Sequence, residues 1–198
     1  TRHRDELARG KTVRKRRRSE ATVNRYLASL SHAFTVASRE WEWIEANPVR
    51  KVSRLREPRG RVRFLLDDER GRLLEACQAS DDPRLYLIVL LAISTGARRG
   101  ERLQLRWQDV DLVRGVAVVH HTKNRERRAL PLAGPALEQV REANRVRRIG
   151  TDHLFADARG RVLFPRQAWE GAVAAAKIED FRFHDLRHSA ASYLAMSG

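Results

Sequence analysis

The chain has 198 residues, with 40 Lys and Arg against 25 Asp and Glu and a net charge of +15. Five of the basic residues are lysines and the rest are arginines, whose planar guanidinium suits bidentate phosphate recognition, so we expect nucleic acid as the partner. Cys77 is the single cysteine, which excludes an intramolecular disulfide and a cysteine-clustered zinc site. The apolar run over residues 86–93 is far too short to cross a bilayer, and the charged residues 1–20 show no signal peptide.

The first predicted element is an amphipathic helix that follows a polar stretch and the basic run at residues 14–18. Ser19 is a suitable N-cap for it. Its apolar stripe has helical spacing and consists of Val23, Leu27, Leu30, Phe34, Ala37 and Trp41. The helix is expected to end near Asn47, because the residue before a proline disfavours the helical conformation. Since one helix cannot bury this stripe alone, we expect further helices before Thr1 or a partner to cover it.

Residues 49–63 predict a basic linker, interrupted by proline and glycine. Two interpretations stay open: a solvated connector, or a connector that crosses from one side of a DNA duplex to the other. The charge pattern is the same for both.

The remaining residues predict one mixed α+β domain, mainly helical with a small antiparallel sheet. Helices are expected over about 67–79, 83–96, 99–105, 135–146 and 165–176, with a last one from about 184. Apolar segments at 115–121 and 127–132 flank a polar turn at 122–126, which predicts a β-hairpin.

Arg98 is a candidate phosphate ligand, because Gly96 ends a buried helix and the next helix begins beside Arg98. Glu101 is expected to fix the guanidinium or to cap this second helix. A surface arginine at a helix corner explains the pattern equally well. Lys123, at the predicted hairpin tip, is either solvated or a general acid placed against a phosphate.

His184 and Arg187 are predicted on one face of the last helix, where they form a compact grip for a phosphodiester. His188 adds a second histidine four residues after His184, which raises a weaker alternative, a zinc peptidase. The metalloprotease motif has Glu as its second residue, where this chain has Asp185. We therefore expect His188 to be a core histidine, and no metal site.

Three segments in order resemble the tyrosine recombinase, or phage integrase, family. Residues 95–101, followed by 105–111, are similar to the family's first arginine box. Residues 122–124 are similar to its hairpin lysine, and residues 184–192 to its second box. The resemblance covers most of the chain, from Ser19 to Gly198.

The resemblance implies two domains. Residues 1–55 would be part of a helical core-binding domain that clamps DNA, with the linker continuing to about 63, and residues 64–198 an incomplete catalytic domain. Double-stranded DNA is the implied partner, with further copies of the chain in a tetrameric synapse and no membrane. The basic residues expected to contact DNA are Arg14, Lys15, Arg16, Arg17, Arg18, Arg25, Arg61 and Arg63. A cytoplasmic, nucleoid-associated protein of bacterial or phage origin would result.

The implied reaction is site-specific DNA breakage and rejoining through a 3′-phosphotyrosyl intermediate, without cofactor or metal. Arg98 and Arg187 would hold the non-bridging oxygens, Lys123 would protonate the leaving 5′ oxygen, and His184 would bind the phosphate or relay the tyrosine proton.

The family's nucleophilic tyrosine lies beyond its second box, and we expect none of Tyr26, Tyr86 and Tyr193 to take that role. The chain would then be a fragment unable to cleave DNA. The alternative is a non-enzymatic DNA-binding relative of the integrases.

Overall fold

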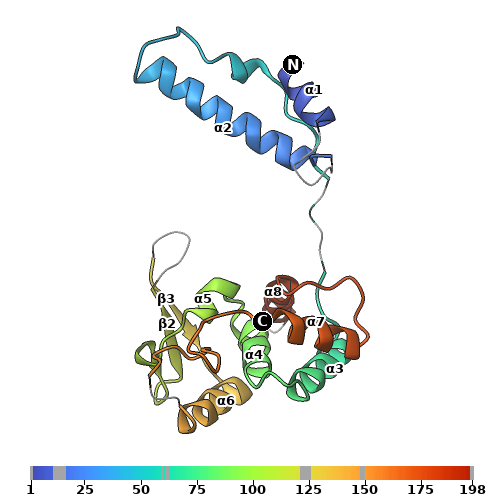
Figure 1. The fold of residues 1–198 in the computed structure, drawn as a ribbon, viewed down its shortest axis with the longest axis vertical. Coiled ribbons are helices and arrows are strands. Elements are labelled where there is room, and N and C mark those ends of the chain that lie inside the picture. Colours follow the sequence, from blue (N-terminus) through green and yellow to red (C-terminus); the bar gives the residue numbers. More distant parts are fainter. Residues whose placement is uncertain are drawn as a thin grey trace. The chain divides into compact units, whose positions relative to one another are not determined.

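A computed structural model describes residues 2–10, 17–58, 60, 63–120, 126–147 and 150–196 (Figure 1). The chain divides into two compact units, Thr1–Arg61 and Val62–Gly198. The first is helical, and the second is helix-rich with a three-stranded antiparallel sheet, so the predicted fold class is confirmed. None of the helices in the described residues has the length and apolar character needed to cross a membrane.

The first unit is built on α2 (Glu20–Arg39), against which α1 (Arg2–Arg9) and the 3₁₀ helix η1 (Pro48–Lys51) pack. Ser19 caps α2 as predicted, and its hydroxyl accepts a hydrogen bond from the Thr22 amide. The predicted end near Asn47 is wrong, because α2 stops at Arg39 and Glu42 then adopts a left-handed conformation with φ of 53°. Trp41 therefore lies outside the helix and is exposed.

Two buried amide side chains hold this unit together. Asn24 in α2 donates to the carbonyl of Leu55 and accepts from its amide, at 2.8 Å in both cases. Asn47 donates to the Ser31 carbonyl at 2.8 Å and caps η1 by accepting from the Val49 amide. Such amides satisfy backbone groups that would otherwise be buried without partners.

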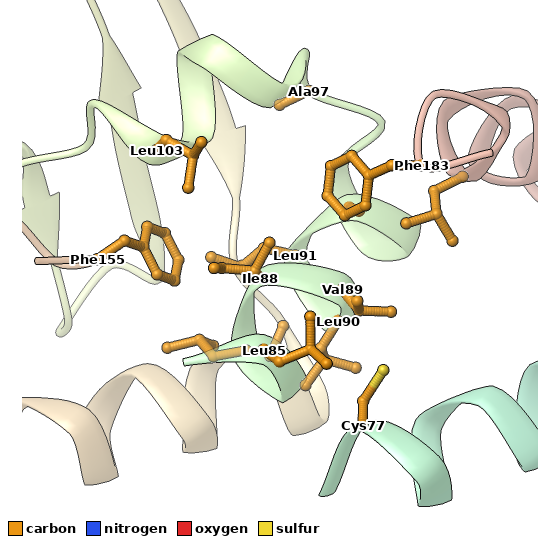
Figure 2. Packing of buried hydrophobic residues seen from close by; sticks show 14 of the residues in the cluster. Cys77, Leu85, Ile88, Val89, Leu90, Leu91, Ala97, Leu103, Phe155 and Phe183 are labelled. Atoms are coloured by element: carbon orange, nitrogen blue, oxygen red, sulfur yellow. The ribbon is translucent and has the colours of Figure 1, made fainter. Parts of the chain in front are cut away.

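The second unit is organised around α4 (Leu85–Thr95), which is apolar on all sides and therefore suited to a central position. It packs against α3 (Asp67–Gln78), α6 (Gly134–Arg145) and α8 (Asp185–Met196), while α7 (Arg166–Ala175) packs on α3. In Figure 1, α4 lies between α6 and α3. Figure 2 shows Phe155 and Leu103 on one side of α4 and Phe183 on another.

The small sheet has the order β1-β2-β3, with β1 (Val110–Asp111), β2 (Val116–Val119) and β3 (Arg128–Pro131) all antiparallel. The strands β2 and β3 form the predicted hairpin, in a register that places Val119 opposite Arg128. The two-residue strand β1 was not predicted. The predicted turn lies mostly outside the described residues.

A backbone segment just before α3 is bound to the last helix. Leu65 is 1% exposed; its amide donates to the Ser189 hydroxyl and its carbonyl accepts from the Tyr193 hydroxyl, each at 2.9 Å. Arg63 pairs with Glu69 at the start of α3. The two hydrogen bonds of Leu65 connect this segment to α8, which carries most of the second predicted box.

Candidate functional site

The turn between α4 and α5 (Arg99–Leu103) forms one side of the site. Gly96 ends α4 in the left-handed conformation, with φ of 58°, and Arg98 is the extended N-cap residue of α5. A side chain at Gly96 would be strained at this φ, and its Cβ would lie 3.4 Å from that of Ala190 in α8. The turn thus lies within van der Waals distance of α8, and its left-handed backbone at position 96 favours glycine.

Glu101 connects Arg98 to the sheet. Its carboxylate accepts hydrogen bonds from the Arg98 amide at 2.9 Å and the Arg98 guanidinium at 2.8 Å, and from Arg128 in β3 at 3.2 Å. It therefore caps α5 and also fixes the guanidinium, the two roles expected of it. Burial opposes ionisation of Glu101, but the hydrogen bonds and charges of both arginines outweigh it and lower its pKa. The Glu101 side chain is 4% exposed, whereas that of Arg98 is 44% exposed and faces solvent.

Arg187, in α8, lies against the same turn. Its guanidinium donates to the carbonyl of Gly96 at 2.7 Å, two residues before Arg98. The structure thus brings the two predicted boxes together through one hydrogen bond, although 91 residues separate its two partners in the chain.

His184 directly precedes α8, and its carbonyl accepts from the Arg187 amide. Its ring is exposed and meets the ring of His188 edge to face, with centroids 5.6 Å apart. The expectation that His188 is a core histidine is wrong, because it too is exposed: it projects from the side of α8 opposite the buried Leu186. In the described parts of the chain, no group of three or more His, Cys, Asp or Glu is placed to hold a metal ion.

Lys123 lies outside the described residues, so its predicted position is not described. The strand that follows it is anchored to the site, because Arg128 at the start of β3 binds Glu101. Directly after β2, the ring of His120 lies 3.0 Å from the carboxylate of Asp109.

The three tyrosines have different surroundings. Tyr193 donates its hydroxyl to the Leu65 carbonyl, and the Arg70 guanidinium lies 4.9 Å from its ring centre. Burial raises the pKa of Tyr193, which disfavours the phenolate needed for attack. Tyr86 is half-buried in α4, and Tyr26 is exposed in the first unit.

The basic residues expected to contact DNA also differ from one another. Arg17 and Arg25 are exposed. Arg18 is half-buried and donates to the Leu7 carbonyl, and Arg63 forms a two-pronged ion pair with Glu69. The guanidinium groups of Arg18 and Arg63 thus have structural partners. The other members of this set, Arg14, Lys15, Arg16 and Arg61, lie outside the described residues.

Two site residues, Arg102 and Arg128, were missed by the sequence analysis. Nothing in the local pattern separates them from the many surface arginines of this chain. The charges of Arg98 and Arg128 act on Glu101, and those of Arg99 and Arg187 act on Arg102. These described groups comprise one carboxylate and five guanidiniums, an excess of positive charge suited to binding an anion such as a phosphate.

A sequence model of the phage integrase family matches residues 63–198. The integrase of Salmonella phage P22 is 32% identical over 90% of the chain and 48% of its own length. A shufflon-specific DNA recombinase of Escherichia coli is 36% identical over 86% of the chain and 43% of its own length. The solved catalytic domain of bacteriophage HP1 integrase is 29% identical and superposes with a TM-score of 0.55 over 70% of this chain and 74% of that domain.

The chain spans about half the length of these two curated relatives. The match to the family model covers the whole second unit from Arg63 onward, and with it both arginine boxes and the hairpin between them. The chain belongs to the phage integrase family.

Proposed function

We propose that the chain contains the phosphate-holding part of a site-specific DNA recombinase. The observation that supports this most directly is the hydrogen bond from Arg187 to Gly96, which places the second-box arginine beside the turn that carries Arg98. Two guanidinium groups beside one turn, of which Arg98 is 44% exposed, supply the charge and the hydrogen-bond donors that bind a phosphodiester. The names of the relatives, integrase and DNA recombinase, point to the same substrate.

In the proposed reaction, Arg98 and Arg187 bind the non-bridging oxygens of the scissile phosphate and stabilise the charge that develops there. His184, whose carbonyl accepts from the Arg187 amide, binds the phosphate or relays a proton. Lys123 protonates the leaving 5′ oxygen. A tyrosine attacks phosphorus, and the 3′-phosphotyrosyl bond keeps the energy of the broken phosphodiester, so the reaction needs no nucleotide cofactor.

None of the three tyrosines of this chain is proposed as the attacking group. The surroundings of Tyr193 support this, because its hydroxyl is engaged with Leu65 and burial raises its pKa. The second candidate function is that of a DNA-binding protein that occupies recombination sites without cleaving them.

The proposed partners are double-stranded DNA and further copies of the recombinase in a tetrameric synapse, and the proposed location is the cytoplasm, at the nucleoid. The first unit would be part of a core-binding domain, with Arg17 and Arg25 among its DNA contacts. Their exposure supports this assignment.

DNA binding is tested by measuring affinity for a short duplex over a range of salt concentrations. The affinity should fall steeply as salt rises, because phosphate neutralisation releases counterions. Arg98→Ala and Arg187→Ala should each weaken binding, whereas Arg166→Ala, which removes an exposed charge paired with Glu170 on α7, should have a smaller effect. Undetectable or salt-independent binding by the unchanged chain contradicts both candidate functions.

Strand cleavage is tested with a protein translated through whatever codons follow Gly198 in its reading frame. Incubation with a duplex that contains the crossover site should yield a protein–DNA adduct that survives denaturation and is lost in Arg187→Ala. Intact DNA binding without an adduct would reject the recombinase proposal in favour of the second candidate.

A further inference from the structure

Arg102, in the last turn of α5, is a buried charge with an incomplete set of hydrogen bonds. The residue is 3% exposed, and its Nε and one terminal nitrogen, Nη1, have no acceptor among the described residues. Buried charged groups in proteins are normally paired and hydrogen-bonded. This arginine is therefore an exception that requires a physical reason.

The surroundings of Arg102 do not neutralise it. Its guanidinium carbon lies 5.1 Å from the centre of the ring of Phe183, the residue that precedes His184 in the sequence. Glu101 is the carboxylate that acts on it, but that carboxylate is already hydrogen-bonded to Arg98 and Arg128. Burial lowers the pKa of Arg102 to about 9, and the positive charges of Arg187 and Arg99 add to the effect. The side chain is still cationic at neutral pH.

A purely structural role does not account for these features. The ring of Phe183 attracts the cation, but it accepts no ordinary hydrogen bond from Nε or Nη1. An apolar side chain of similar volume would fill the same space, and such replacements of buried charges are often neutral or stabilising. Local rules of this kind are broken mainly at functional sites. The charge of Arg187, the residue proposed to hold the phosphate, acts on Arg102, and Arg102 contacts Phe183 just before the second box.

We propose that Arg102 is a positioning residue of the phosphate site, which strengthens anion binding through its buried positive charge beside the second box, at the expense of stability when no anion is bound. The proposal rests on the proposed function, in which Arg187 binds a DNA phosphate. An anion in front of Arg187 offsets the repulsion between the two guanidiniums. Because Arg102 is buried, it acts without touching DNA.

The test compares Arg102→Met with the unchanged chain, by thermal unfolding with and without a short DNA duplex at constant low salt. Arg102→Met should raise the midpoint without DNA, because it removes an unsatisfied buried charge. It should also reduce the upward shift caused by DNA, with about a tenfold loss of affinity. The salt dependence of binding should keep its slope, because no phosphate contact is lost.

Two further variants serve as controls. Arg145→Met removes one positive charge from an exposed position of α6, where Arg145 pairs with Glu142, and should leave the midpoint and the DNA-induced shift unchanged. Arg102→Lys keeps the charge and should keep most of the DNA-induced shift.

Three results would overturn the proposal. A lower midpoint or failure to fold in Arg102→Met would show that the arginine is structural. A higher midpoint with an unchanged DNA-induced shift would show that its charge does not reach the phosphate. Absence of a DNA-induced shift in the unchanged chain would instead reject the proposed function, and this proposal with it, so the two failures are distinguishable.

Discussion

At the scale of single residues, Glu101 is the group on which the candidate site depends most. Its carboxylate accepts hydrogen bonds from Arg98, at the start of α5, and from Arg128, the first residue of β3. One carboxylate thus sets the position of a candidate phosphate ligand relative to the strand that follows Lys123. Removal of its charge leaves both guanidiniums without their counterion.

Glu101→Gln is expected to lower the free energy of unfolding by about 1–3 kcal/mol, a value limited by the partial exposure of both arginines. The pKa of Glu101 is lowered by folding, so its contribution is present above the ordinary carboxyl value of 4.5 and is lost as the pH falls through the lowered value. Urea unfolding of both proteins from neutral to acidic pH should therefore give a difference that shrinks on acidification.

Glu142→Gln provides the control for this series. Glu142 pairs with Arg145 on the surface of α6, where ion pairs contribute little, and the change should be about 0.5 kcal/mol or less. An equal loss in both variants, or a Glu101→Gln effect that does not depend on pH, would contradict the role assigned to Glu101.

At the scale of elements, the end of α4 is the most constrained point of the site. Gly96→Ala should destabilise the protein by about 1 kcal/mol, because an L-residue disfavours the left-handed conformation. Gly100→Ala lies four residues on, inside α5, where an added Cβ meets open space. It should be stabilising by about 0.5–1 kcal/mol, because alanine favours the helix.

Thermal unfolding of the two glycine variants checks both signs. A stabilising Gly96→Ala would mean that the turn relaxes easily, and Arg187 would then not be held by a rigid carbonyl. DNA affinity should fall only in Gly96→Ala. Strain at this position should displace the backbone carbonyl that accepts from Arg187.

The start of α2 offers an independent test at the same scale. Ser19→Ala removes the hydroxyl that accepts from the Thr22 amide and should cost about 1 kcal/mol. Ser29→Ala removes an exposed hydroxyl from the middle of the same helix and should be neutral or slightly stabilising. Urea unfolding followed by helical circular dichroism would compare them, and equal effects would argue against capping by Ser19.

At the scale of the whole molecule, the division into two units makes a prediction about truncation. A chain that begins at Arg63 should fold on its own, because the second unit is compact. A chain that begins at Asp67 should be less stable by about 3 kcal/mol or more, because it lacks buried Leu65 and the two hydrogen bonds between that residue and α8.

Urea unfolding of the two fragments measures this difference directly. Equal stabilities would mean that residues 63–66 belong to the linker, whereas the sequence boundary near 63–64 places residues 64–66 in the second domain. A sharp loss in the shorter fragment would assign these residues to the second unit.

Much of the fold was predictable because it depends on local patterns. The Ser19 cap, the apolar α4 that ends at Gly96, and the alternating segments of the hairpin all have signals within a few residues. The end of α2 was not predictable in this way. Proline at position 48 allows the helix to continue to Asn47, but the chain turns earlier at Glu42, and Asn47 caps η1 instead.

The sequence by itself determined the class of fold, the family resemblance and the identity of the candidate residues, because each depends on residue types at short spacings. Only the tertiary structure decided that Arg187 reaches Gly96, that Glu101 is shared with Arg128, that His188 is exposed and that Arg102 is buried without full pairing. Contacts and burial of this kind join segments far apart in the chain. They depend on how α4, α5 and α8 pack together, which no local pattern records.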